Sequence, residues 1–200
     1  MQSIARVNTL AYGDGMKPQL TPTDWIKASF VALTAGGPQA IRAESIARAL
    51  KVSKGSFYWH FADVPALKLA MLDHWEQAAT KNIIDLVNLK ATTAEDRLRV
   101  LVQVSTSSTD NEYGGVMAEA AIRDWARYDE NAAAALKSVD QQRLDFVQTQ
   151  FQTHGIPKAQ CKQNASILYA ALIGLNHLSH HGFANPSRDL GAVLDHLLRP

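Results

Sequence analysis

Hydrophobic side chains recur every three or four residues along most of the chain, which is the spacing of an α-helix that buries one face. The first such pattern covers residues 24–35, with Thr23 or Asp24 as the expected N-cap and Gly36-Gly37-Pro38 as the stop signal. A shorter pattern follows over residues 41–50, and a third begins shortly after it. The pattern therefore predicts three helices in succession near the N-terminal end.

A longer helix is expected from Val64 to about Leu89, with Pro65 in its first turn, where a missing N–H costs nothing. The helical period then continues to the end, and no segment alternates apolar and polar residues as a half-buried strand would. Breaks between helices are expected at Thr92-Thr93, Gly114-Gly115, near Asp129, at Gly155-Ile156-Pro157 and at Asn185-Pro186. The pattern predicts an all-α protein of about nine helices.

The last two predicted helices, at about 158–182 and 187–198, carry continuous apolar faces. In the final helix these positions are Leu190, Val193, Leu194, Leu197 and Leu198. The preceding helix also contains small residues, among them Ala170 and Gly174, between its larger apolar side chains. Two such helices at a C-terminal end are suited to association with a second copy of the chain.

Composition and charge narrow the class of protein. The chain has 200 residues, 46% of them hydrophobic and 20% charged, so it can bury a substantial core. It contains neither an apolar run of membrane-spanning length nor the charge order of a signal peptide, and we expect it to be cytoplasmic. The single cysteine, Cys161, excludes an internal disulfide and fits a small side chain packed near a helix start.

The small net charge of +1 hides an uneven distribution along the chain. Residues 1–63 carry seven Lys and Arg against four Asp and Glu, whereas residues 64–200 carry thirteen against fifteen. Because partners respond to local fields, the basic N-terminal part is a candidate for contact with a polyanion.

The segment between Arg42 and Phe61 has the arrangement of a helix-turn-helix, in which two packed helices let the second project side chains into a DNA groove. Packing positions are supplied by Ile46, Ala47, Leu50 and Val52. Ser53 is the expected cap of the recognition helix, and Phe57 and Phe61, four residues apart, are expected to face the core.

The run Ser-Ile-Ala-Arg-Ala-Leu-Lys-Val-Ser-Lys-Gly-Ser-Phe-Tyr-Trp-His-Phe, residues 45–61, resembles the DNA-binding signature of the TetR (tetracycline-repressor) family. The resemblance extends over roughly residues 24–75. It implies an N-terminal three-helix helix-turn-helix domain, a larger helical domain that binds a small effector, and a homodimer formed by the last two helices. It also implies repression that a ligand relieves.

Carried over by position, the family's DNA contacts fall on a mainly polar and aromatic set, to which Arg42 is added as a residue that can reach a phosphate. The remaining members are Lys54, Gly55, Ser56, Tyr58, Trp59 and His60. Three positions depart from the family pattern: Arg42 replaces a neutral Thr or Ser, Lys51 a glycine, and Val64 a lysine. Lys51 would be strained if its φ were positive, and Val64 removes one phosphate contact.

The C-terminal part contains enough aromatic and flexible apolar side chains to line an effector pocket, although most of them are expected to fill the core. The set consists of Tyr113, Met117, Trp125, Tyr128, Phe146, Phe151, Tyr169 and Phe183. Met117, Trp125 and Tyr169 are the chosen effector-binding candidates. The charged neighbours Arg123-Asp124 and Arg127-Glu119 are interpreted as a solvated face or as interface ion pairs.

A histidine cluster is the one candidate for metal chemistry. His177 and His181 have the i, i+4 spacing that can hold a metal, and His180 lies between them. No carboxylate or cysteine accompanies them, so a polar stripe or a dimer contact is favoured, and no metal or other cofactor is expected.

Together these features predict a ligand-responsive DNA-binding regulator, a repressor released from a palindromic operator by a small, largely apolar effector. The expected organisation is a mobile arm over residues 1–21, a DNA-binding domain over 22–66, and an effector-binding and dimerisation domain over 67–200. One alternative is a helical interaction or architectural DNA-binding protein without an effector. A small helical enzyme is the other, but no nucleotide-binding loop or catalytic pair supports it.

Overall fold

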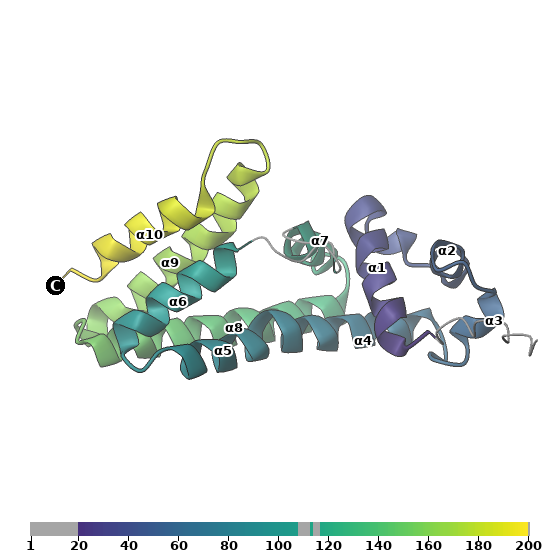
Figure 1. Ribbon diagram of the computed structural model, residues 1–200, viewed down its shortest axis with the longest axis horizontal. Helices are drawn as coiled ribbons and strands as arrows, with labels where there is room; N and C mark the ends of the chain where they lie inside the picture. The colour runs from purple at the N-terminus through teal and green to yellow at the C-terminus, as the bar shows by residue number, and fades with distance from the viewer. Residues whose placement is uncertain (1–19, 108–112, 114–116, 200) are drawn as a thin grey trace, which may run out of the picture.

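The computed structural model describes residues 20–107, 113 and 117–199, and within these ranges all regular structure is helical (Figure 1). In chain order the helices are α1 Pro22–Gly36, η1 Pro38–Ala40, α2 Ala43–Ala49, α3 Lys54–Phe57, α4 Val64–Glu76, η2 Gln77–Lys81, α5 Asn82–Lys90, α6 Ala94–Thr106, α7 Met117–Trp125, α8 Glu130–His154, α9 Lys158–Ser179 and α10 Pro186–Leu197. The predicted all-α fold, with an N-terminal helix-turn-helix followed by a larger helical part, is confirmed.

Helix α1 begins two residues earlier than predicted, because the N-cap is Thr21 rather than Thr23 or Asp24. The amide of Asp24 donates to the Thr21 hydroxyl (3.4 Å), and the Asp24 carboxylate accepts from the Thr21 amide (2.7 Å). This reciprocal capping box leaves position N1 to Pro22, which has no N–H to satisfy. The helix ends at Gly37, where φ is +72°, as the glycine stop signal predicts.

The predicted long helix is present as α4, η2 and α5 in continuous succession. Its N-cap is Asp63, whose carboxylate accepts from the Ala66 amide at 2.8 Å. The middle segment η2 is a π-helix, which the hydrophobic pattern does not predict. A π-bulge inserts one residue into the helical ladder and frees a backbone carbonyl for another donor. In this segment the carbonyl of Ala79 accepts a hydrogen bond from Arg143 of α8 at 3.0 Å.

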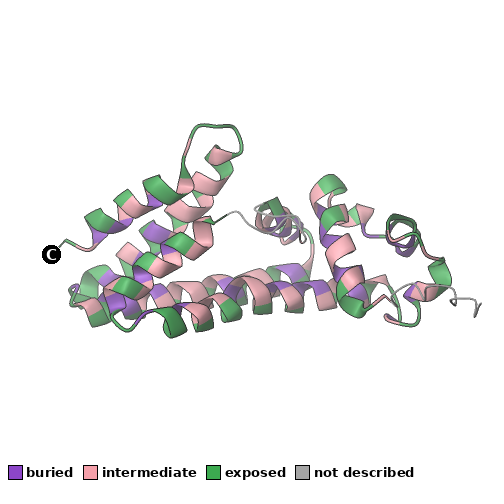
Figure 2. Cartoon of the chain, in the orientation of Figure 1, coloured by how far each residue is buried: buried purple, intermediate pink, exposed green. Residues whose placement is uncertain are grey.

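Two hydrophobic cores lie along the molecule (Figure 2). The first contains residues of α1, α2, α3, α4, α7 and the first part of α8. Trp25, Phe57 and Ile122 are fully buried in it. The second joins α6, α8, α9 and α10, and contains Phe151, Cys161 and three leucines of α10. As predicted, Phe57 and Phe61 are core residues and Cys161 is packed near a helix start.

The predicted breaks at Thr92-Thr93, Asp129 and Gly155-Ile156-Pro157 fall between helices, and the one at Asn185-Pro186 falls at the N-cap and first residue of α10. Asp129 and Asn185 are N-caps whose side chains accept from Ala132 and Arg188. The predicted break at Gly114-Gly115 and the predicted arm, apart from its last two residues, lie outside the described residues. In Figure 1 the helix-turn-helix occupies one end of the molecule, and α6, α9 and α10 occupy the other, with α7 between them.

Candidate nucleic-acid interface and internal cavity

Aromatic side chains in the core pack against the recognition segment, residues 53–61, which contains α3. Phe57 meets the ring of Trp25 edge to face at 5.5 Å and lies 5.8 Å from Phe61. Ser53 is at the N-cap of α3 as predicted, but its side chain makes no capping bond, and the helix is only four residues long. Buried rings therefore fix the position of the segment more than capping does.

The predicted DNA-contact residues lie on the outer side of this segment. Trp59 is 88% exposed and Tyr58 56% exposed, although both carry large apolar rings. Gly55 is also exposed, and a Cβ there would meet only the Ser53 hydroxyl, at 3.7 Å. Ser56 is half-buried. Exposed aromatic rings beside a glycine form a surface on which sugar and phosphate can pack closely.

His60 differs from its neighbours because it is half-buried, with its ring 6.1 Å from that of Trp25. It therefore lies at the boundary between the core and the exposed surface.

The two cationic members of the set are held by local partners. Lys54 forms a surface ion pair with Glu44 of α2, which raises the pKa of Lys54 and lowers that of Glu44 through the shared hydrogen bond. Arg42, the N-cap of α2, donates from Nε to the carbonyl of Gln39 at 3.0 Å. Both side chains are exposed, so each can exchange its partner for a phosphate.

The turn between α2 and α3 contains Lys51 with φ of +57°, among the described residues the one non-glycine with positive φ. The conditional prediction of strain at this position is therefore met, because a side chain with Cβ is disfavoured there.

A cavity of about 750 Å³ borders the second core, of which Val102, Val147, Leu168 and Leu190 line it. Its walls come from η2, α5, α6, α7, α8, α9 and α10 and are mainly apolar. The apolar side chains include Ile83, Ile84, Leu101, Val102, Phe146, Val147, Leu168, Leu172, Ile173 and Leu190. The volume falls within the usual range for sites that hold small organic molecules, about 300–1,000 Å³.

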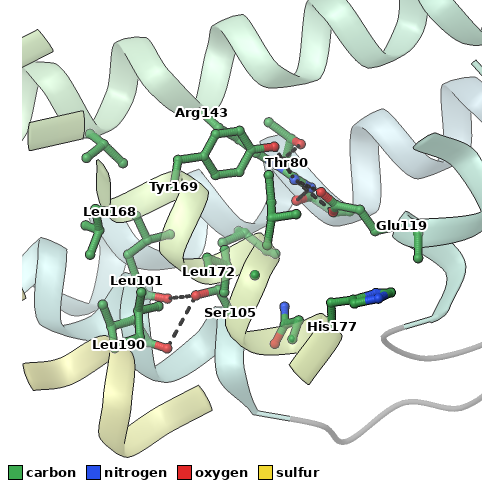
Figure 3. A pocket seen from close by; sticks show the side chains of 18 of the residues that line it. Thr80, Leu101, Ser105, Glu119, Arg143, Leu168, Tyr169, Leu172, His177 and Leu190 are labelled. Carbon is green, nitrogen blue, oxygen red and sulfur yellow. Dashed lines mark hydrogen bonds and ion pairs between the residues drawn. The ribbon is translucent and has the colours of Figure 1, made fainter. Parts of the chain in front are cut away.

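A cluster of charged side chains closes one side of this cavity (Figure 3). Arg143 donates from Nη1 to both carboxylate oxygens of Glu119 (2.9 and 2.8 Å) and to the hydroxyl of Tyr169 (2.9 Å). Its Nε donates to the hydroxyl of Thr80 in the π-helical segment at 3.1 Å. The cluster thus joins α7, α8, α9 and η2 at a single guanidinium.

A second arginine completes the cluster. Arg123 of α7 donates to Asp140 of α8 through Nη1 (3.2 Å) and Nη2 (2.7 Å), and to Glu119 through Nε (3.2 Å). Tyr169 donates its hydroxyl proton to Asp140 at 2.6 Å. Two guanidinium and two carboxylate groups balance, so the cluster carries no net charge.

The environment keeps Tyr169 and the two arginines in their ordinary protonation states. Burial raises the pKa of Tyr169, and its hydrogen bond to Asp140 acts in the same direction. Burial lowers the pKa values of Arg123 and Arg143, but Asp140 and Glu119 outweigh it at Arg123 and Glu119 outweighs it at Arg143, so both pKa values are raised. Tyr169 is therefore a neutral donor, and both arginines stay charged.

The effector-binding candidates do not all reach the cavity. Met117 and Tyr169 line it, whereas Trp125 is 2% exposed and packs in the first core, where Lys68 lies over its ring. In the wider aromatic set, Phe146 also lines the cavity. Trp125 points away because it follows Ala118 and Ile122 on the inward face of α7.

The interpretation of the charged residues on α7 requires correction. Glu119 does not pair with Arg127, which lies near Asp124 at the surface (3.8 Å), but with Arg123 and Arg143 inside the molecule. Arg143 and Asp140 were not predicted. The signal for Arg143 was its place between Val139 and Val147, because a charged residue four positions from each lies on a buried helical face.

The histidines gather at the end of α9. The ring of His181 is 6.2 Å from that of His177 and 5.4 Å from that of His180, and His177 and His180 line the cavity. In the described part of the chain no three His, Cys, Asp or Glu side chains are grouped as metal ligands.

A basic and aromatic surface on a buried three-helix core defines a helix-turn-helix DNA-binding protein. Residues 26–70 match the family of bacterial regulatory proteins described as the tetR family. The matched segment of the chain contains the helix-turn-helix, which supports a DNA-binding transcriptional regulator. No curated protein matches its sequence.

Solved structures show the same fold over most of the chain. A putative TetR-family transcriptional regulator from Rhodococcus sp. is 20% identical with a TM-score of 0.74, covering 89% of this chain and 98% of that one. The reduced form of NemR from E. coli is 18% identical with a TM-score of 0.66, covering 88% and 94%. A putative transcriptional regulator from Saccharomonospora viridis in complex with choline is 15% identical with a TM-score of 0.71, covering 88% and 92%.

No helix in the described part of the chain is long and apolar enough to cross a membrane.

Proposed function

We propose that this chain is a homodimeric repressor, without enzymatic activity, that leaves a palindromic operator when a small, largely apolar effector enters the cavity. The observation that carries the proposal is the position of α7. Its residues Ala118, Ile122 and Trp125 belong to the core shared with the DNA-binding helices, whereas Glu119 and Arg123 line the cavity. A ligand that displaces α7 therefore acts on both regions at once.

DNA contact is assigned to the exposed set around α3. Arg42, Lys54 and Ser56 supply hydrogen-bond donors, while Tyr58 and Trp59 supply broad rings. Gly55 permits close approach of the backbone, and His60 supports the segment from its half-buried position.

Dimerisation is assigned to α9 and α10, within residues 158–182 and 187–198. Ile167 in the middle of α9 and Leu178 near its C-terminal end are more than 40% exposed in the single chain, which leaves apolar surface on this helix for a partner. A two-fold dimer would present two α3 segments about 34 Å apart, one turn of B-DNA, to an inverted repeat. A regulator of this kind would act in the cytoplasm.

The experiment uses the inverted repeat found in DNA next to the gene, with binding measured by fluorescence anisotropy. Compounds that raise the melting temperature of the protein are then tested for release of that DNA. Ala120→Trp fills part of the cavity and should abolish release while operator binding persists, whereas Ala133→Trp, on the exposed face of α8, should preserve both.

Two results contradict the proposal. Ligands that bind the cavity without changing operator affinity would favour an architectural DNA-binding protein. Turnover of a bound compound by the pure protein would favour an enzyme.

A further inference from the structure

The charged cluster in the cavity wall restricts which ligands the cavity can accept. We infer that its ligand is an electrically neutral molecule with an apolar body and a hydroxyl group that donates a hydrogen bond to Glu119. The inference rests on the proposed function and adds the chemical class of the effector.

Anions are disfavoured because the positive charges of both guanidinium groups are already neutralised by carboxylates. In Arg143, Nε donates to Thr80, Nη1 to Glu119 and Tyr169, and Nη2 to the carbonyl of Ala79. All three nitrogens of Arg123 likewise donate to Glu119, Asp140 or Tyr169. An anionic ligand would add an uncompensated negative charge beside two carboxylates, or would displace Glu119 or Asp140 and leave that carboxylate unpaired in a half-buried place.

Cations are disfavoured for the corresponding reason. The charges of Glu119 and Asp140 are already neutralised by Arg123 and Arg143, so an ammonium group would add an uncompensated positive charge to the cluster. The ring of Tyr169 offers no compensation, because Arg123 and Arg143 already lie 5.7 and 5.8 Å from its centroid. A third positive charge at this ring would be repelled by both.

A neutral hydroxyl meets neither obstacle. Oε2 of Glu119 accepts one bond, from Nη1 of Arg143, whereas Oε1 accepts from both arginines. A carboxylate oxygen can accept a second donor, so a ligand hydroxyl can bind at Oε2 without breaking an ion pair. The apolar remainder of the ligand would then contact the leucine and isoleucine side chains of α5, α6 and α9 (Figure 3).

The test compares three probes with the same chain and different head groups: 1-octanol, octanoate and octylammonium. Calorimetric titration of the free protein at pH 7 should give 1-octanol a dissociation constant at least about tenfold lower than that of either ion. Tighter or equal binding of either ion, or no binding of 1-octanol, overturns the inference.

Variants that each neutralise one charge of the cluster provide a second test. Glu119→Gln leaves a surplus positive charge in the cluster and should move the preference about tenfold towards octanoate. Arg143→Gln leaves a surplus negative charge and should move it towards octylammonium. Glu95→Gln alters an exposed glutamate that pairs with Arg99 outside the cavity, and should keep the wild-type order.

Thermal unfolding identifies any variant that does not fold, and the wild-type selectivity decides the inference in that case. Because these titrations contain no DNA, they are independent of repression. If 1-octanol binds with the expected selectivity but releases no operator, the inference that the ligand is neutral stands and the proposed function fails.

Discussion

The two hydrophobic cores are built for different purposes. The first is filled by large rings, with Trp25, Phe57 and Trp125 almost completely buried, and it extends from the DNA-binding helices into α7 and α8. The second consists mainly of aliphatic side chains and borders the cavity of about 750 Å³. Dense packing transmits displacement, whereas open volume admits a ligand. The contrast teaches that α7, which contributes to both regions, is the element on which ligand binding and DNA binding can act together.

The largest expected effect comes from opening a hole in the first core. Trp125→Ala should lower the free energy of unfolding by about 3–5 kcal/mol, because a large ring is removed from a site that cannot collapse completely. Operator binding should fall with it, since Trp125 shares its core with α1. Urea denaturation followed by circular dichroism measures the change. Tyr128→Ala, at a residue 77% exposed, is the control and should change stability by less than about 0.5 kcal/mol.

The next effect tests the boundary between the cores. Arg143→Met should destabilise the protein by about 2–3 kcal/mol, because it leaves the cluster with an excess carboxylate, and the side chains of Arg143 and Glu119 are only 16% and 29% exposed. Adding Glu119→Gln should recover at least about 1 kcal/mol, a coupling that a double-mutant cycle measures. Strict additivity of the two substitutions would mean that the pair contributes nothing to the fold.

Most of the first region could be predicted from the sequence, and much less of the second. Ile46, Phe57 and Phe61 follow local helical periodicity, so their burial is readable from spacing alone. The cluster of Glu119, Arg123, Arg143 and Tyr169 joins residues from three helices, with separations of up to 50 positions between Glu119 and Tyr169 along the chain. Periodicity reports the buried face of one helix but not which helix it meets.

The hydrophobic pattern also does not predict two local features, the choice of N-cap for α1 and the π-helix in the long helix. Thr21, Thr23 and Asp24 are all acceptable N-caps, and the choice of Thr21 depends on the proline that follows it and on the reciprocal bond with Asp24. In the π-helix at 77–81 the carbonyl of Ala79 accepts from Arg143, a residue 64 positions away along the chain.

The third prediction separates the DNA-contacting surface from the core beneath it. Lys54→Ala should weaken operator binding by roughly three- to tenfold in a mobility-shift titration, and the slope of affinity against salt should fall by about one phosphate contact. Stability and dimerisation should be unchanged, because Lys54 is exposed and belongs to neither core. Unchanged binding would remove Lys54 from the interface. Lys137→Ala, on the exposed face of α8, is the matched control.

A smaller effect is expected from pH at the edge of the first core. Burial lowers the pKa of His74, whose ring stacks on that of Tyr113 at 4.7 Å and whose Nε2 is buried with no hydrogen-bond partner among the described residues. The unfolded chain therefore takes up a proton near pH 6.5 before the folded protein does, and stability should fall as the pH drops from 7.5 through 6.5. His74→Phe keeps a ring and removes the titration, so its stability should vary less over this range. Equal pH profiles for the two proteins, measured by denaturation, would contradict this role.

The smallest effect comes from the exposed ion pair, and it contrasts with the buried one. In the free protein Glu44 holds Lys54, and both side chains are about half exposed, so solvent and salt weaken the pair. Glu44→Gln should leave stability unchanged and tighten operator binding about two- to threefold at low salt, because Lys54 no longer exchanges a carboxylate for a phosphate and a negative charge near DNA is removed. The gain should disappear in the Lys54→Ala background and shrink as salt is raised, in anisotropy titrations. A gain that persists without Lys54 would mean that Glu44 acts on DNA by its charge alone, and the pairing would have no part in setting affinity.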